Sequence, residues 1–232
     1  MVEIKGLEKF APKDFPGFIA STVFLPGCNF RCPYCHNSGL VLRPETYATI
    51  PTGFFLAYLD SRQGWLEGIC VSGGEPLLAA GLEELLSVIK ERKMLVKLDT
   101  NGSRPEKMKR LIEAKLVDWL AMDVKAPLSR YGEVTRSAVA PEEIARSVEI
   151  IAASGLDYMF RTTVVPGLVG EKDILEIARW LAGSRIFQIQ QFSPVDTLDR
   201  NFEQIQPFSR DEIHRLEELA RPYFDEVRVE GV

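Results

Sequence analysis

Three closely spaced cysteines are the residues of this chain best suited to chemistry. Cys28, Cys32 and Cys35 form a Cys-x-x-x-Cys-x-x-Cys segment, and the 232 residues contain only one further cysteine, Cys70. A [4Fe–4S] cluster normally takes four cysteine ligands, so three thiolates leave one iron with an open coordination position. Because an open iron can bind a substrate or a cofactor, the segment predicts a reactive centre.

Two other uses of the thiols compete with this interpretation. A structural zinc site needs four ligands, usually from two separate pairs. The candidates for a fourth ligand are Cys70, which lies in an apolar run, and His36, which directly follows Cys35 and gives poor tetrahedral geometry. A disulfide is disfavoured because the first residues lack the apolar segment of a secretory signal. The spacing favours iron–sulfur and leaves zinc open.

The composition is that of an ordinary globular chain, with 46% hydrophobic and 26% charged residues. A chain of 232 residues can form one sizeable hydrophobic core, so we expect a single domain over residues 1–232. The net charge of −5 argues against a nucleic-acid partner. No apolar run approaches the roughly 20 residues of a membrane span, and the few cysteines favour a reducing cytoplasm.

Short β-rich runs alternate with helix-period segments along the chain. The runs that we expect to be strands are residues 18–24, 66–71, 95–98, 117–122, 158–165, 186–189 and 227–229. Helical spacing of apolar residues occurs in segments 82–89, 144–151 and 174–181, and Pro105, Pro141 and the capping box Ser209–Glu212 mark helix starts. This alternation predicts an α/β fold, an incomplete (β/α)6-type parallel barrel.

Polar motifs follow these strands, at the strand ends where such sheets collect their chemistry. The motifs are the three cysteines, Ser72-Gly73-Gly74-Glu75-Pro76, Asp99-Thr100-Asn101-Gly102 and Asp123-Val124-Lys125. Each motif could be a simple turn, because Gly-Gly and Asn-Gly are common there. Their repeated position at one end of successive strands instead predicts a shared site.

Individual side chains allow further expectations. The Gly73-Gly74 backbone can approach a ligand closely, and beside Glu75 it suits an amine better than a phosphate. Asp123 and Lys125 point to one side of a strand, where they can converge on a pocket or form a surface salt bridge. Arg161 lies in an apolar strand, so we expect it to face the barrel mouth and meet a carboxylate. Gln188 and Gln190 are expected to face the pocket, and Gln191 to point away from it.

The two motifs, three cysteines followed by Gly-Gly-Glu-Pro after the next strand, resemble the radical S-adenosylmethionine superfamily. Asp99-Thr100-Asn101-Gly102, Met122-Asp123-Val124-Lys125 and Val164-Val165-Pro166-Gly167 are similar to motifs of the enzymes that activate glycyl-radical enzymes. Over nearly the whole chain, the sequence most resembles the longer, barrel-type activating protein of anaerobic ribonucleoside-triphosphate reductase.

The resemblance implies a radical enzyme with defined site residues. Cys28, Cys32 and Cys35 would hold a [4Fe–4S] cluster whose open iron binds S-adenosylmethionine. The other expected cofactor contacts are Tyr34 near the adenine, Gly73, Gly74 and Glu75 at the methionine amine, Asp99, Asp123 and Lys125 along methionine and ribose, and Arg161, Gln188 and Gln190 at the mouth. A small electron donor (ferredoxin, flavodoxin or thioredoxin-like) would reduce the cluster. The resulting 5′-deoxyadenosyl radical would take a hydrogen atom from a glycine of the partner reductase.

Alternatives to this function remain open. The chain lacks an inserted ferredoxin-like domain, so we expect one cluster. Pyruvate formate-lyase activators often have a His after the sixth strand, where this chain has Phe192-Ser193-Pro194, which favours the reductase activator. The other possibilities are a pyruvate formate-lyase type activator, a radical enzyme acting on a small molecule such as the deazapurine-forming synthases, and a non-catalytic iron–sulfur carrier or zinc-stabilised binding module.

Overall fold

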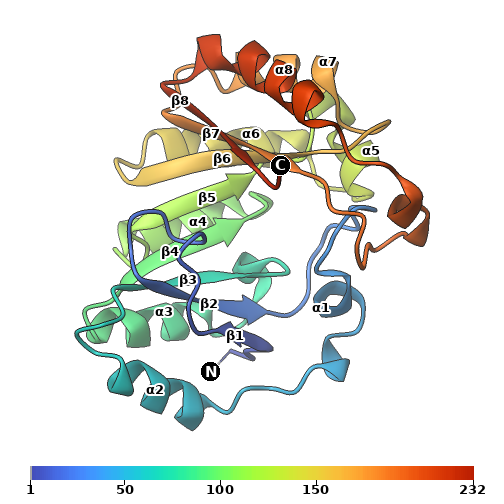
Figure 1. Cartoon of the computed structure of the whole chain (residues 1–232). Coiled ribbons are helices and arrows are strands. Elements are labelled where there is room, and N and C mark those ends of the chain that lie inside the picture. The colour runs from blue at the N-terminus through green and yellow to red at the C-terminus, as the bar shows by residue number, and fades with distance from the viewer. Residues whose placement is uncertain (1) are drawn as a thin grey trace. The chain divides into compact units, whose positions relative to one another are not determined.

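The computed structural model describes residues 2–232 (Figure 1). Eight strands follow one another in the sheet in their chain order: β1 (Gly6–Glu8), β2 (Ala20–Leu25), β3 (Gly68–Gly73), β4 (Leu95–Thr100), β5 (Trp119–Asp123), β6 (Asp157–Val164), β7 (Ile186–Gln191) and β8 (Glu226–Glu230). The pairs β2–β3, β3–β4, β6–β7 and β7–β8 are parallel. The predicted α/β fold with an incomplete parallel barrel is therefore confirmed.

The strand number differs from the (β/α)6 prediction. β1 precedes the cysteine segment and pairs with β2 in the antiparallel direction. The sequence gives little sign of this strand because it has only three residues. The other strands match the expected runs to within two residues at each end, and β2 to β7 each contain an apolar segment that becomes buried.

Helices connect the strands: α1 (Ser38–Leu42), α2 (Thr52–Ser61), α3 (Leu82–Glu91), α4 (Pro105–Glu113), α5 (Tyr131–Thr135), α6 (Pro141–Ala152), α7 (Glu171–Trp180) and α8 (Arg210–Ala220). The expected starts are confirmed, since α4 and α6 begin with Pro105 and Pro141. The capping box at α8 is also present, with the Ser209 side chain accepting from Glu212 N. None of the helices between residues 2 and 232 combines the length and the apolarity of a membrane span.

The chain divides into two compact units, and the prediction of one domain over residues 1–232 stays a prediction. The first unit comprises residues 2–29, 39–100 and 106–120. Its core contains consecutive buried residues of β2, β3 and β4, together with one face of α3, which packs against β4. The residues of α3 that point into this core are Leu82, Leu85, Leu86 and Ile89, as their spacing predicts.

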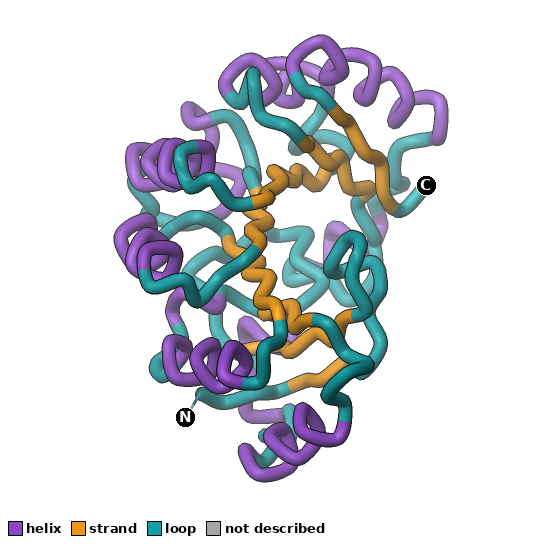
Figure 2. Tube along the Cα trace, turned by 90° about the vertical axis from the view of Figure 1, so that its left-hand side faces the viewer, coloured by secondary structure: helices purple, strands orange, loops and turns teal. Residues whose placement is uncertain are grey.

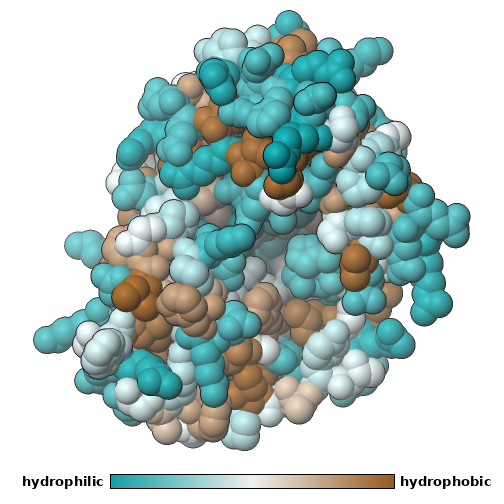
Figure 3. Space-filling view, viewed as in Figure 1, coloured by the Kyte–Doolittle hydropathy of each residue, from teal (hydrophilic) through white to brown (hydrophobic). Residues whose placement is uncertain are grey.

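The second unit comprises residues 30–38, 101–105 and 121–232. Here α8 packs against α7, β7 and β8. It buries Ile213, Leu216 and Ala220, and the surface over α8 in Figure 3 is largely hydrophilic, as an amphipathic helix requires. Several helices lie beside the strands, and loops run from the strand ends (Figure 2).

Candidate active site

The residues expected to form a site are divided between the two units. The first unit carries Cys28, Gly73, Gly74, Glu75 and Asp99. The second unit carries Cys32, Tyr34, Cys35, Asp123, Lys125, Arg161, Gln188 and Gln190. Gly73, Asp99 and Asp123 are already part of their strands, so the polar motifs begin in the last strand residues and continue into the loops.

The two glycines after β3 are required by close backbone packing. A Cβ on Gly73, whose φ is +117°, would lie 2.4 Å from Leu25 O, and a Cβ on Gly74 would lie 1.9 Å from Gly27 O. The amide of Gly74 donates to Leu25 O at 2.9 Å. These contacts account for both glycines within the protein itself, and they fix the backbone that a ligand would meet.

The Glu75 carboxylate is turned into the protein. The residue is wholly buried, and its carboxylate accepts hydrogen bonds from Leu77 N at 3.0 Å and from Thr100 Oγ1 at 2.8 Å. The first bond caps the 3₁₀ helix Pro76–Leu78. The second joins the end of β3 to the end of β4, so Glu75 links two of the predicted motifs. Its contact with an amine stays a prediction.

Asp99, near the end of β4, has a neighbour that the sequence motifs did not indicate. Its carboxylate forms an ion pair with Lys97, and Ser72 Oγ lies 3.4 Å from Asp99 Oδ2. Lys97 lies inside the expected strand 95–98 and belongs to none of the polar motifs. A charged residue two positions before Asp99, on the same side of the strand, is the signal that could have identified it.

Asp123, Lys125 and Arg161 form an ion cluster in the second unit. Arg161 Nε lies 2.8 Å from Asp123 Oδ1, and Lys125 Nζ lies 3.2 Å from Asp123 Oδ2. The expectation that Arg161 meets a carboxylate is confirmed. The convergence of Asp123 and Lys125 is also observed, in the form of the salt bridge that was the simpler interpretation.

The ion cluster keeps its carboxylate charged. Burial alone would raise the pKa of Asp123, but the positive charges of Arg161 and Lys125 outweigh burial and hold that pKa well below its usual value. Burial likewise favours a lower pKa for Lys125, yet Asp123 and the nearby thiols of Cys32 and Cys35 raise it. Lys125 therefore presents an ammonium group next to two of the three cysteines.

The cysteine loop is fastened by backbone hydrogen bonds. In its second-unit part, Arg31 N donates to Thr135 O at 2.8 Å, and Asp199 N donates to Pro33 O at 2.9 Å. The Phe30 ring also packs edge-on against Tyr131, with ring centroids 6.1 Å apart. These contacts tie the loop to α5 and to the segment that follows β7.

The four cysteines are thiols in the structure. Cys32 and Cys70 are buried, whereas Cys28 and Cys35 are partly exposed. Burial raises the pKa of the Cys35 thiol, and the positive charge of Lys125 opposes this effect. Within residues 2–232, no three His, Cys, Asp or Glu side chains are gathered closely enough to hold a metal ion. The loop supplies three thiol donors, Cys28, Cys32 and Cys35.

Tyr34 carries a buried hydroxyl group that lacks a partner. The residue is 5% exposed, and its hydroxyl makes no hydrogen bond to any residue in the described range 2–232. Burial raises the pKa of this phenol well above its usual value, so the group stays protonated. Because an unpaired buried hydroxyl is costly, this atom marks a place where a polar ligand group would be stabilised.

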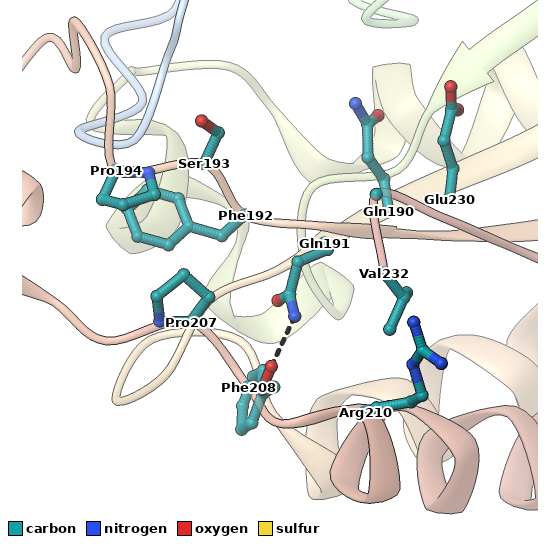
Figure 4. Close-up of a pocket in the computed structure, with 11 residues that line it drawn as sticks. Gln190, Gln191, Phe192, Ser193, Pro194, Pro207, Phe208, Arg210, Glu230 and Val232 are labelled. Atoms are coloured by element: carbon teal, nitrogen blue, oxygen red, sulfur yellow. Dashed lines mark hydrogen bonds between the residues drawn. The ribbon is translucent and has the colours of Figure 1, made fainter.

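Gln188 and Gln190 lie on the same side of β7 but have different surroundings. Gln188 Nε2 donates to Glu230 Oε2 at 2.5 Å. Gln190 and Gln191 both line a cavity of about 610 Å³ at the ends of β7 and β8, although Gln191 was expected to point away from the pocket. Figure 4 shows Gln190 and Gln191 pointing to opposite sides of the strand, and Gln191 Nε2 donates to Phe208 O at 2.6 Å. Gln191 therefore points away from Gln190, as the period of a strand predicts.

Comparison with known proteins identifies the family. The model of the Radical SAM superfamily matches residues 22–181. The chain belongs to the radical SAM superfamily. A Methanocaldococcus jannaschii protein assigned to the glycyl-radical enzyme activating enzymes is 33% identical over 234 residues, which cover 99% of this chain and 96% of that protein. This radical SAM protein is thus an enzyme of the glycyl-radical activating group.

More distant relatives of this radical SAM protein differ in their reactions. The pyruvate formate-lyase-activating enzyme of Streptococcus mutans is 26% identical over 206 residues, which cover 84% of this chain and 78% of that enzyme. The 7-carboxy-7-deazaguanine synthase of Chlorobaculum tepidum is 31% identical over 162 residues, which cover 66% of this chain and 67% of that enzyme.

Solved structures show the same fold at low identity. Streptococcus suis SuiB bound to S-adenosylmethionine superposes with a TM-score of 0.69 and 16% identity, covering 90% of this chain and 52% of SuiB. TYW1 with a lysine-pyruvate adduct gives a TM-score of 0.61 and 15% identity, covering 90% of this chain and 76% of TYW1. This chain spans about half of the length of SuiB, and at such identities the likeness concerns the fold alone.

Proposed function

We propose that this enzyme cleaves S-adenosylmethionine reductively at a [4Fe–4S] cluster and places a radical on a glycine of anaerobic ribonucleoside-triphosphate reductase. The observation that carries the proposal is the loop with three thiols, Cys28, Cys32 and Cys35, in a chain similar over its full length to an activating enzyme. The donor set fits the cluster because three cysteines, with no fourth cysteine in the loop, match a site-differentiated iron.

The residues around the loop fit the second cofactor. The unpaired hydroxyl of Tyr34 offers a polar contact beside the thiols, and we place the adenine there. Asp123 is kept ionised by Arg161 and Lys125, so it can accept hydrogen bonds from ribose hydroxyls or face the sulfonium charge. We also expect the Gly73, Gly74 and Glu75 segment to receive the methionine amine, mainly through its backbone.

The cofactors and the protein side chains have different roles in the proposed reaction. When bound, the cluster and S-adenosylmethionine supply one-electron cleavage of a carbon–sulfur bond and removal of a hydrogen atom from the glycine. The three thiols would hold and orient the cluster, and Lys125 adds positive charge next to Cys32 and Cys35. Arg161, Gln188 and Gln190 are proposed to close the mouth against water.

Two partners belong to the proposal. The first is the glycyl-radical protein, and the second is a small electron donor of the ferredoxin, flavodoxin or thioredoxin-like kind. A low-potential cluster requires reducing, anoxic surroundings, so we expect the enzyme to act in an anaerobic cytoplasm.

The test uses protein purified without oxygen and reconstituted with iron and sulfide. We expect the reduced protein to release 5′-deoxyadenosine from S-adenosylmethionine, and to produce a glycine-centred doublet in electron paramagnetic resonance spectra when the reductase is added. Cys32→Ala should abolish both signals and the iron–sulfur absorption. Cys70→Ala is the matched control, because Cys70 is a buried thiol outside the loop. Full cleavage activity in Cys32→Ala would refute the cluster assignment.

The similarity to the S. mutans enzyme supports a second candidate, an activator of pyruvate formate-lyase type. The same assay separates the two candidates when each partner protein is offered in turn. If the doublet forms with pyruvate formate-lyase and not with the reductase, pyruvate formate-lyase is the target of the enzyme. Cleavage without a glycyl radical on either protein would favour a small-molecule substrate.

A further inference from the structure

A lysine ammonium is buried in the first unit without any role in the motifs above. Lys97 lies in the middle of β4, and its side chain is 1% exposed. Its ammonium pairs with Asp99, lies 3.7 Å from Cys70 Sγ, and lies 5.4 Å from the ring centroid of Trp119. In the strand register Lys97 stands directly opposite Cys70 on β3.

Stability alone does not explain why an ion pair occupies this position. A buried ammonium loses its hydration, and the attraction of one carboxylate does little more than offset that loss. Apolar pairs of similar size are often as stable as buried ion pairs or more stable. Besides Asp99, the groups next to the Lys97 ammonium are the thiol of Cys70 and the ring of Trp119, which are both buried. A methionine at position 97 would suit these surroundings better if packing were the only requirement.

The Lys97–Asp99 ion pair lies at the end of β4, where the orientation of the Asp99 carboxylate would affect a ligand bound at the strand ends. Asp99 is the next-to-last residue of β4, and Ser72, at the same end of β3, approaches its second carboxylate oxygen. Lys97 lies two residues earlier on the same side of the strand, and its Nζ donates to Asp99 Oδ1. Lys97 thus favours one orientation of the Asp99 carboxylate.

We propose that Lys97 is a positioning residue that fixes the Asp99 carboxylate for contact with S-adenosylmethionine. This inference rests on the proposed function and on the expectation, implied by the family resemblance, that Asp99 lies along the methionine and ribose of the cofactor. Lys97 itself, buried below the strand end, acts only through Asp99. Its loss should therefore weaken cofactor binding only when Asp99 is present.

The experiment is a double-mutant cycle with three variants, Lys97→Met, Asp99→Asn and the double variant. The dissociation constant of S-adenosylmethionine is measured by anaerobic equilibrium dialysis on reconstituted protein, and urea unfolding is measured on iron-free protein. We expect Lys97→Met to raise the dissociation constant about tenfold, and the double variant to bind no more weakly than Asp99→Asn. Lys90→Met is the matched control, because it breaks the Lys90–Asp118 ion pair of the same unit at 2.6 Å; its dissociation constant should stay that of the wild type.

Each outcome decides the matter. Lys97→Met with wild-type affinity, or an equal loss of affinity with and without Asp99, would overturn the inference while leaving the proposed function intact. If Lys97→Met does not fold, the affinity of Asp99→Asn for S-adenosylmethionine is compared with that of the charge-balanced double variant. Equal affinities support the inference. Weaker binding by the double variant overturns it. A double variant that also fails to fold would make Lys97 a folding residue and overturn the inference. Failure of the wild type to bind S-adenosylmethionine would refute the proposed function itself.

Discussion

Replacing Asp123 by asparagine removes the negative charge from the ion cluster while keeping the shape of the side chain. In the wild type, Arg161 Nε lies 2.8 Å from Asp123 Oδ1 and Lys125 Nζ lies 3.2 Å from Asp123 Oδ2. In the variant these two cations lose their negative partner. Exposed ion pairs contribute about 0–1 kcal/mol, whereas removing one partner of a wholly buried pair costs about 3–5 kcal/mol. The side chains here are 17% to 27% exposed. We therefore expect the free energy of unfolding to fall by about 2 kcal/mol.

The same cluster predicts a definite pH dependence. The pKa of Asp123 lies below the usual 3.8 in the folded protein. A carboxyl group with a lowered pKa stabilises the folded state fully above its unfolded pKa, and this contribution is lost as the pH falls through the folded value. The difference between wild type and Asp123→Asn should therefore be largest near neutral pH and shrink as the pH falls below about 4.

Urea unfolding of iron-free protein at several pH values measures both effects. Glu133→Gln is the control, because Glu133 pairs with Arg130 at 2.7 Å in the same unit but is 60% exposed. That variant should lose less than about 1 kcal/mol. Equal stability of Asp123→Asn and wild type at neutral pH, or a difference that does not shrink in acid, would refute the reasoning about the cluster.

Three further changes test the geometry of the site by the same unfolding assay. Gly74→Ala places a Cβ against Gly27 O and should cost about 3 kcal/mol, whereas Gly53→Ala in α2 meets no atom within 4 Å and should be neutral or stabilising by up to about 1 kcal/mol. Tyr131→Phe loses the hydroxyl contacts with the backbone next to the ion cluster, 3.2 and 3.3 Å long, and should cost about 1 kcal/mol. Tyr34→Phe removes an unpaired hydroxyl, so the cofactor-free protein should keep its stability or gain up to about 1 kcal/mol, while affinity for S-adenosylmethionine in equilibrium dialysis should fall. A clear loss of stability in Tyr34→Phe, or equal effects of the two glycine changes, would contradict these assignments.

The strands β2 to β7 could be predicted from the sequence because their apolar runs contain their buried residues. Segment 95–98, for example, lies within β4, and segment 186–189 within β7. The strand β1 was missed because three residues cannot show a period. The helix α2 was missed because its apolar residues do not keep to one face: Phe55 is buried, whereas the adjacent Phe54 is 52% exposed.

The site was predictable where a residue type has few ordinary uses, as with three cysteines in eight residues or an arginine within an apolar strand. It was less predictable where a motif residue serves the fold as well. Glu75 is an example, because its carboxylate caps a 3₁₀ helix and bonds to Thr100. The sequence also concealed Lys97, because a single lysine in a short run does not reveal whether its ammonium reaches water or a buried carboxylate.

The way the cysteine loop is fastened has a practical consequence for spectroscopy. Two bonds that anchor it, from Arg31 N to Thr135 O and from Asp199 N to Pro33 O, join main-chain atoms only. Thiols in the loop can therefore be exchanged for serine or selenocysteine while these anchors persist. A changed absorption or resonance signal in such a protein would then report the altered ligand atom rather than a displaced polypeptide.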